Sequence, residues 1–383
     1  MRLGAIPETP LEWLGLRLGR VPTPLIDTHL AFAFARTVMV AVQVGVFEAL
    51  AEGPASPEEV ARRCGTAPVP TRRLVMALVG VGYLKPAGTE RVALGRHVAR
   101  WLTRGSAMSV VDKVTFAFDE WRLVEGYEDY VRHGVAVGMH GAAAAARGVA
   151  AAAGPGADGG SRPARAPSGG DGAEAAANDA WVRYQRGLRA VAAVSADEVA
   201  RRTPVPAGAR RLIDLGGGHG LFAAALLRRY PGLRATVLDL APAVDAALAA
   251  GVPADLRGRL EHRVADALND PLGDGDVDVV FASQLNHHFG EADNRALATR
   301  VAAALRPGGV YVVQDLARPA DPREARRARL GALLDLYFGA TSDGGTYPIA
   351  AMRAWQIGAG LRPAGVRWLR TLPGLVQQTA MKP

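Results

Sequence analysis

The sequence has a single cysteine and no long hydrophobic run. Cys64 is the only cysteine among 383 residues, so an internal disulfide is impossible and a zinc site built from cysteines is not expected. No stretch reaches the roughly 18 uncharged apolar residues that predict a membrane-spanning helix. The start, MRLGAIPETPLEWLG, lacks the apolar segment of a signal peptide. We therefore expect a cytoplasmic protein that does not bind a membrane.

Lysine is also scarce, although the chain is basic. Lysine and arginine together number 45 against 37 acidic residues, which gives a net charge of +8, yet only Lys85, Lys113 and Lys382 are lysines. Net charge alone is a weak indication of a nucleic-acid partner, and the arginines are spaced as on solvated helix faces. The 49% hydrophobic and 21% charged residues are typical of a soluble globular protein. No nucleic-acid partner is expected.

Residues 1–105 predict a winged-helix domain. Ser56 and Glu59 predict a capping box at the start of one helix, and Gly65 predicts its end. A second helix follows in PVPTRRLVMALVGVG, and YLKPAGTERVAL predicts two short strands around a turn. Before them, residues 28–53 are apolar on most faces of a helix, so we expect this segment to be buried against something large.

Residues 106–200 are predicted to link this domain to the rest of the chain through helices. The first of these helices is rich in aromatic residues, and the last begins at DAWVRYQ. Between them, residues 141–178 consist largely of alanine and glycine and contain no aromatic residue. Such a segment buries too little apolar surface to offset the conformational entropy lost on ordering. We therefore expect a disordered insertion there, with at most a frayed helix in its alanine runs.

Residues 201–383 alternate between strand and helix patterns. RRLIDLG, RATVLDL, LEHRVADAL, VDVVFASQL and VYVVQDL are predicted strands, and EADNRALATRVAAALRPGG is a predicted helix. This alternation predicts an α/β domain with a doubly wound parallel sheet. After helices near 322–339 and 348–360, two further strands are joined by Pro373 and Gly374. Because the turn between them is short, we expect the last pair to be antiparallel.

The segment LIDLGGGHG predicts a nucleotide-binding site. A strand breaks into glycines before a helix, so the backbone can approach a ligand closely. Gly218 and Gly220 with Ala223 fit the dinucleotide fingerprint G-x-G-x-x-A. The same glycines with Asp214 and Gly216 fit D-x-G-x-G-x-G, which is the pattern of S-adenosylmethionine methyltransferases. The glycines alone leave both interpretations open.

The residues around the glycines favour the methyltransferase interpretation. Asp239 ends the next predicted strand, where an acidic residue can accept hydrogen bonds from ribose hydroxyls. Asp266 ends the third predicted strand, where methyltransferases hold the adenine. The LRPGG segment and the antiparallel final pair of strands also match methyltransferases.

With these motifs in order, the chain resembles the bacterial and plant small-molecule O-methyltransferases that have an N-terminal winged-helix dimerisation domain. The resemblance covers residues 30–135 and 180–383. Its N-terminal part is carried by VGVFEALAEGPASPEEVARRCGTAPVPTRRLVMALVGVGYL. Its C-terminal part is carried by LIDLGGGHG, TVLDL, VADAL, LRPGG and SDGGTYPIAAMRAWQIGAGLRP.

The resemblance implies a Rossmann-like, seven-stranded methyltransferase domain over residues 201–383. It also implies that the mainly helical N-terminal domain forms a homodimer and that the helices of residues 106–200 cover the active site. The implied cofactor is S-adenosylmethionine, with S-adenosylhomocysteine as product. The implied cofactor contacts are Asp214, Gly216, Gly218, Asp239, Leu240, Asp266, Ala267 and Ser283.

The resemblance also gives the pair in NHHF two different interpretations. In the family, the loop after the fourth strand often supplies a histidine general base, and His287 aligns with that base. Asp315 matches the acidic residue that holds the base. A general base suits the chemistry, because a phenol has a pKa of about 10 and is little ionised at neutral pH. A carboxylate on the other ring nitrogen would fix the tautomer of the histidine.

His288 aligns with an acidic position of the family and is expected to contact the acceptor or cap a helix. The family's second acidic residue is absent, because this chain has Thr346 and Tyr347 in GGTYP. A metal ion is not expected, since adjacent loop residues usually point in different directions and no third ligand has suitable spacing. Trp121, His288, Tyr337, Phe338, Met352 and Trp355 are the expected acceptor contacts, and core packing is the alternative role for each hydrophobic one.

The predicted function is methyl transfer to a hydroxyl group of an aromatic or polyketide-type secondary metabolite. One alternative is carbon or nitrogen methylation on the same scaffold, and another is a cofactor-binding protein that has lost the transfer activity. A winged-helix DNA-binding regulator is a third alternative. It is disfavoured because the second helix is mostly apolar beyond Arg72 and Arg73 and has few side chains that could read bases.

Overall fold

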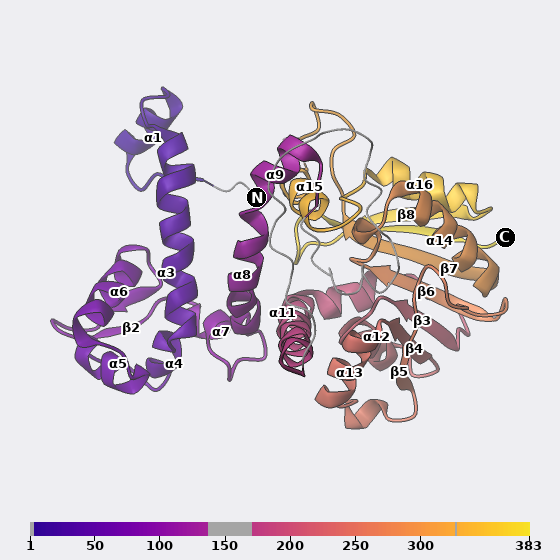
Figure 1. The fold of residues 1–383 in the computed structure, drawn as a ribbon, viewed down its shortest axis with the longest axis horizontal. Coiled ribbons are helices and arrows are strands. Elements are labelled where there is room, and N and C mark those ends of the chain that lie inside the picture. Colours follow the sequence, from indigo (N-terminus) through magenta and orange to yellow (C-terminus); the bar gives the residue numbers. More distant parts are fainter. Residues whose placement is uncertain (1–3, 137–170, 326–327) are drawn as a thin grey trace. The chain divides into compact units, whose positions relative to one another are not determined.

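The computed structural model describes residues 4–136, 171–325 and 328–383. The chain divides into two compact units, Met1–Phe118 and Asp119–Pro383 (Figure 1). The division falls inside helix α8 (Val111–Val124) and not near residue 105. Most of the expected insertion, residues 141–170, lies outside the described residues.

The first unit is mainly helical, with one small sheet. In chain order its elements are α1 (Pro10–Arg17), α2 (Thr23–Leu25), η1 (Ile26–Leu30), α3 (Ala31–Gln43), α4 (Val46–Ala49), α5 (Pro57–Cys64), α6 (Pro68–Gly80), β1 (Leu84–Pro86), β2 (Val92–Leu94), α7 (Val98–Leu102) and the first part of α8. The antiparallel pair β1–β2 follows α5 and α6, as the winged-helix prediction requires.

Local sequence signals set the ends of α5. The Ser56 side chain accepts a hydrogen bond from the Glu59 N–H at 3.2 Å, and the Glu59 carboxylate accepts one from the Ser56 N–H at 2.7 Å. This is the predicted capping box, which satisfies two backbone donors at the helix start. Gly65 ends the helix with a φ of 62°, a left-handed conformation that glycine adopts without steric cost.

The helical run Thr23–Gln43 exposes large apolar side chains within its own unit. Leu30, Phe32 and Phe34 are exposed, whereas the buried residues Met39 and Val42 lie near its C-terminal end. By length and composition alone, this is the one helix among the described residues that could cross a membrane, a test that core helices of soluble proteins also pass. Residues 28–53 were expected to be buried throughout. Within the helical run, this expectation is met only near its C-terminal end.

The second unit is an α/β domain. In chain order it contains the end of α8, α9 (Tyr127–His133), α11 (Asp171–Arg202), β3 (Arg211–Leu215), α12 (Leu221–Arg229), β4 (Arg234–Asp239), α13 (Ala241–Ala250), η2 (Ala254–Leu256), β5 (Leu260–Val264), β6 (Val277–Ser283), η3 (Asn286–His288), α14 (Glu291–Ala304), β7 (Leu305–Leu316), α15 (Arg329–Thr341), α16 (Ile349–Gly358), β8 (Arg362–Trp368) and β9 (Leu375–Met381).

These strands form one seven-stranded sheet in the order β5-β4-β3-β6-β7-β9-β8 (Figure 1). The pairs among β3, β4, β5, β6 and β7 are parallel, and β9 is antiparallel to both β7 and β8, as predicted. The carboxyl ends of the five parallel strands therefore lie at one edge of the sheet. Ligands of open α/β sheets bind outside this edge.

Two predicted boundaries were wrong. The helix expected to extend through LRPGG ends at Ala304, and β7 begins at Leu305. Pro307 explains the early end, because proline lacks an N–H and disfavours helix at the residue before it. Residues 171–178, expected to be disordered, belong to α11, which agrees with the high helix propensity of their alanines.

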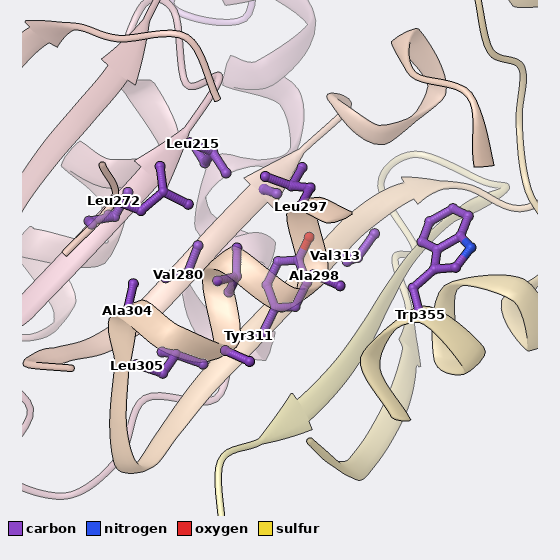
Figure 2. Close-up of a cluster of buried hydrophobic side chains, with 14 of the residues drawn as sticks. Leu215, Leu272, Val280, Leu297, Ala298, Ala304, Leu305, Tyr311, Val313 and Trp355 are labelled. Carbon is purple, nitrogen blue, oxygen red and sulfur yellow. The ribbon is translucent and has the colours of Figure 1, made fainter. Parts of the chain in front are cut away.

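The central strands are held by a continuous apolar core. Figure 2 shows Val280 of β6 with Tyr311 and Val313 of β7, packed with Leu297 and Ala298 of α14. All seven residues of β6 are buried, the pattern of a parallel strand that is covered on both faces. Polar residues at the ends of β6 and β7 are consequently attached to rigid strands.

Candidate active site

The loop between β3 and α12 is built from glycines that no other residue could easily replace. Gly216, Gly218 and Gly220 have φ values of 67°, 45° and 65°, in the left-handed region that favours glycine. A Cβ atom on Gly217 would lie 2.5 Å from the carboxyl carbon of Asp214. The loop thus exposes backbone at the carboxyl edge of the sheet, where a ligand can approach closely.

Asp239, the last residue of β4, is hydrogen-bonded to this loop. Its carboxylate accepts one bond from the Gly218 N–H and one from the Leu240 N–H, both at 2.7 Å. Burial raises the pKa of Asp239 to about 6, although the two hydrogen bonds oppose the shift. Asp239 is therefore mostly ionised at neutral pH and can accept further hydrogen bonds, such as those from a ribose.

Asp214, the predicted first residue of the glycine motif, is fully buried in β3. Burial raises its pKa to about 7, and the nearby charge of Asp239 adds to the shift. Two acidic groups therefore lie beside the cofactor loop, of which Asp214 is fully buried and Asp239 is half-buried.

The remaining predicted cofactor residues also follow the parallel strands. Asp266, beyond β5, accepts hydrogen bonds from the Leu268 N–H and the Asn269 amide, each at 2.9 Å. Ala267 packs against the core cluster, and Ser283, the last residue of β6, accepts a hydrogen bond from the Gln314 amide at 2.8 Å. Together these residues occupy the ends of strands that share one edge of the sheet.

Sequence reasoning missed three residues at this edge. A Cβ on Gly216 would lie 2.7 Å from the Leu285 side chain, and a Cβ on Gly218 would lie 2.5 Å from the Gln185 amide oxygen. Burial raises the pKa of Tyr184, and the nearby charges of Asp239 and Glu120 raise it further. No local spacing marks these residues, because their partners are distant in the sequence.

The structure brings His287 and Asp315 into contact. His287 lies in η3, just after β6, and Asp315 lies near the end of β7. The His287 Nδ1 is 2.8 Å from one Asp315 carboxylate oxygen, and the His287 N–H donates to the other at 3.2 Å. The Leu316 N–H donates to the first oxygen at 2.8 Å. With 3% and 1% exposure, both residues are shielded from water.

Aromatic rings surround the His287 imidazole. The Phe338 ring stacks on it, with 3.7 Å between ring centroids and 24° between ring planes. The His288 ring lies 4.3 Å away at a tilt of 57°. The His287 carbonyl accepts hydrogen bonds from the Gly345 N–H at 2.9 Å and the Ser342 hydroxyl at 3.1 Å. Both the ring and the backbone of His287 are thereby fixed.

The residues of GGTYP have structural contacts. The Thr346 hydroxyl lies 3.0 Å from both the Gly331 carbonyl and an Asp335 carboxylate oxygen. The Tyr347 hydroxyl donates to the Phe289 carbonyl at 2.7 Å. The Thr346 contacts attach the segment after α15 to that helix, and the Tyr347 contact attaches it to the loop that carries His287.

The predicted acceptor residues separate into two groups. Trp121, Tyr337, Phe338 and His288 are half-buried, and the Tyr337 hydroxyl donates to the Glu120 carboxylate at 3.2 Å. Met352 and Trp355, by contrast, are 0% and 2% exposed and belong to the core cluster, in which Figure 2 labels Trp355. We therefore assign core packing to this second group. In the described ranges no group of three histidine, cysteine or acidic residues could hold a metal ion.

Two family models match the chain. An O-methyltransferase domain matches residues 171–356, and an O-methyltransferase dimerisation domain matches residues 26–105. The chain belongs to the O-methyltransferase family. This O-methyltransferase carries its glycine loop and its His287–Asp315 pair within the first of these matches, and its helix-rich unit within the second.

Known relatives agree with this membership. The O-methyltransferase is 28% identical over 295 residues to 3-hydroxy-5-methyl-1-naphthoate 3-O-methyltransferase of Streptomyces sahachiroi, covering 77% of each chain. It is 28% identical over 351 residues to the tetracenomycin polyketide synthesis 8-O-methyl transferase TcmO of Streptomyces glaucescens, covering 89% of this chain and 91% of the relative. The fold matches human N-acetylserotonin methyltransferase in complex with SAM, with a TM-score of 0.76, 19% identity and 99% of each chain covered.

Proposed function

We propose that His287 is the general base with which this S-adenosylmethionine-dependent methyltransferase deprotonates a hydroxyl group of an aromatic or polyketide-type small molecule. The observation that carries the proposal is the buried hydrogen bond between His287 and Asp315 at the carboxyl edge of the sheet. The glycine loop lies at the same edge, where Leu285, two residues before His287, contacts Gly216.

The residues at this edge fit the cofactor. The glycine loop offers backbone without side chains, and Asp239 offers an ionised carboxylate for ribose hydroxyls. Asp266 and Ala267 are proposed to hold the adenine. When bound, S-adenosylmethionine supplies a methyl group on a positively charged sulfur, which needs no further activation.

His287 is oriented for proton removal. If its Nδ1–H donates to Asp315, its Nε2 carries a lone pair and is free to accept a proton. His287 takes the hydroxyl proton at Nε2, which would leave the acceptor oxygen as the nucleophile for the methyl group that the cofactor supplies. The Asp315 carboxylate then stabilises the imidazolium, since it already accepts a hydrogen bond from the ring.

The proposed acceptor class rests on the aromatic residues near the base and on the named substrates of the relatives. Trp121 and Tyr337 are half-buried aromatic residues, and flat aromatic side chains suit an aromatic acceptor. The two bacterial relatives above are named for O-methylation of a hydroxynaphthoate and of a tetracenomycin polyketide.

The base assignment is tested with His287→Ala and a phenolic acceptor. We expect turnover at pH 7 to fall by about 100-fold or more, which is the usual contribution of a general base. Turnover of the variant should recover as the pH approaches the phenol's pKa of about 10, because the phenolate then forms without a base. His288→Ala is the matched control, and we expect it to retain most of the activity. Near-normal turnover of His287→Ala at pH 7 would overturn the assignment.

The atom that receives the methyl group is tested by NMR of the product. We expect a methyl ether on the former hydroxyl. A product methylated on carbon or nitrogen would favour the alternative chemistry on the same scaffold, and would remove the reason for a base acting on a phenol.

We also propose that the dimerisation domain joins two copies of the chain. The apolar face of the Thr23–Gln43 run supports this, since Leu30, Phe32 and Phe34 are exposed in the single chain. Sedimentation should give the mass of a dimer for the natural sequence and a lower mass for Phe34→Glu. A monomer at all concentrations would contradict the proposal.

A further inference from the structure

A cavity lies beside the glycine loop, and none of the predicted cofactor or acceptor residues forms part of it. It has a volume of about 160 Å³ and is formed by α11, the start of α12, the C-terminal half of α13 and strand β5. Figure 1 shows these elements in the second unit. Apolar residues make up half of its wall, and five of them are the alanines Ala224, Ala246, Ala247, Ala249 and Ala250.

Two polar side chains of the wall have unused hydrogen-bonding atoms. Gln185 is only 7% exposed, and its amide oxygen has no hydrogen-bond partner among the described residues. Both ring nitrogens of His262 are buried and also lack a partner there. Buried polar atoms are normally hydrogen-bonded, because leaving one unsatisfied costs about 1–3 kcal/mol. Their presence indicates that a ligand with polar atoms completes this site.

Positive charge gathers at the same cavity. Arg186 and Arg189 lie three residues apart on α11, both line the cavity, and neither forms a hydrogen bond or ion pair with another described residue. Neighbouring Arg183, in contrast, is paired with Asp119 at 3.0 Å. Residues three apart on a helix lie on the same face, so both guanidinium groups can reach one anion.

His219 adds a neutral donor to the wall. Its Nδ1 accepts a hydrogen bond from the Leu221 N–H at 3.0 Å, which leaves the proton of the neutral ring on Nε2. Burial, together with the charges of Arg189 and His262, lowers the pKa of His219 to about 3, so the ring stays neutral at physiological pH. Among the described residues that line the cavity, none is acidic. An anion would therefore meet attraction without a competing carboxylate.

We propose that this cavity binds a small organic carboxylate, whose anionic group pairs with Arg186 and Arg189 and whose apolar body contacts the alanines of α13. Arginine binds carboxylates with two parallel hydrogen bonds, which suits the paired guanidinium groups. The volume suits one ring, because an engineered apolar cavity of about 150 Å³ holds benzene. An arylcarboxylate of the size of benzoate meets both requirements.

The position of the cavity connects it to the cofactor loop. His219 and Gly220 line it, and they directly follow Gly218, whose N–H donates to Asp239. None of the predicted cofactor or acceptor residues lines the cavity, although Gly220 belongs to the glycine loop and Gln185 lies against Gly218. The carboxylate therefore occupies a separate site that borders the loop at His219 and Gly220. Its binding can alter the affinity for the cofactor without displacing the cofactor.

Calorimetric titration of the full chain with benzoate tests the proposal. We expect binding of benzoate to the natural sequence, both alone and when the protein is saturated with S-adenosylhomocysteine. The double variant Arg186→Gln/Arg189→Gln should bind benzoate at least tenfold more weakly. Arg201→Gln, an exposed arginine of the same helix, is the matched control and should bind as the natural sequence does. Because the titration without S-adenosylhomocysteine stands alone, its result does not depend on the cofactor assignment.

Several results would overturn the proposal. Equal affinity of the double variant and the natural sequence would show that the arginines do not bind the anion. Loss of benzoate binding in the presence of S-adenosylhomocysteine would place benzoate in the cofactor site. Equal affinity for benzamide, which is uncharged, would remove the role of charge, and equal affinity for inorganic phosphate would remove the role of the apolar wall.

Discussion

The ring of Phe338 stacks on the imidazole of His287, with 3.7 Å between the centroids and 24° between the planes. The sequence had indicated Phe338 as an acceptor contact, but its nearest aromatic partner in the structure is the proposed base. The two residues come from different elements, α15 and η3. This contact holds one face of the imidazole while Asp315 holds its edge, so that two independent interactions orient the ring.

Replacing Phe338 should therefore affect turnover more than acceptor binding. We expect Phe338→Leu to lower kcat by about tenfold, because even small misplacement of a catalytic group is costly. The KM for the acceptor should change less than threefold, by about 0.7 kcal/mol or less. Phe338→Tyr keeps the stacked ring and should retain most of the activity. A raised KM with unchanged kcat would instead identify Phe338 as an acceptor contact.

Replacing Asp315 tests the orientation of the base. The Asp315 carboxylate accepts hydrogen bonds from the His287 ring, the His287 N–H and the Leu316 N–H. Asparagine keeps the shape but loses the charge, so Asp315→Asn should lower kcat at pH 7 by about 100-fold or more, as in other carboxylate–histidine pairs. Steady-state rates measured from pH 6 to pH 10 give the readout.

A merely structural role for Asp315 predicts a different profile. If the carboxylate serves the base, the deficit of Asp315→Asn should narrow as the pH approaches the pKa of the acceptor phenol. If the variant instead lost the same factor at every pH, the loss would reflect distortion of the site and the assigned role would be wrong.

The fold was largely predictable because the strands carry a strong local signal. VDVVFAS is apolar throughout and ends at a polar loop, so β6 and its carboxyl end follow directly from the sequence. Asp239 was predicted for the same reason, since it ends such a strand, whereas Asp315 was predicted from the family resemblance. The boundary at Leu305 was missed because the residues that signal the end of a helix, Pro307, Gly308 and Gly309, themselves belong to β7.

The remaining site residues could not be predicted, for a physical reason. Gln185 and Leu285 reach the glycine loop from elements distant in sequence, and no periodicity records such a contact. Met352 and Trp355 show a second reason why the sequence does not identify site residues. An apolar residue on a helix has the same pattern whether it lines a pocket or packs in the core, and only the structure shows that these two are in the core.

Gly344 offers a test of how closely the loops around the base must pack. A Cβ on Gly344 would lie 2.5 Å from the carbonyl oxygens of both His287 and Phe289. Because backbone atoms cannot move aside cheaply, we expect Gly344→Ala to displace the loop that carries the base and to lower kcat by at least tenfold. Gly358→Ala is the control, since its Cβ would meet no atom within 4 Å. Equal kcat values for the two variants would show that the loop tolerates the displacement.

Glu198 of α11 should make the stability of the second unit dependent on acid pH. It is buried, and it accepts hydrogen bonds from the N–H groups of Arg370 and Thr371 and from the Arg202 side chain. Burial alone would raise the pKa of Glu198, but these hydrogen bonds outweigh it and lower the pKa to about 2. In the unfolded chain a glutamate has a pKa of about 4.3.

The direction of the pH effect follows from these two values. A lowered folded-state pKa means that Glu198 contributes its full stabilisation above about pH 4.3 and loses it as the pH falls toward 2. We expect Glu198→Gln to lower the free energy of unfolding at pH 7 by about 1.5–3 kcal/mol, the range for hydrogen bonds to a charged group. Urea unfolding from pH 7 to pH 3 should show a smaller loss of stability for the variant than for the natural sequence. Glu128→Gln, which removes only the exposed pair with Arg132, should cost less than about 1 kcal/mol, and an equal cost for both variants would contradict the assignment.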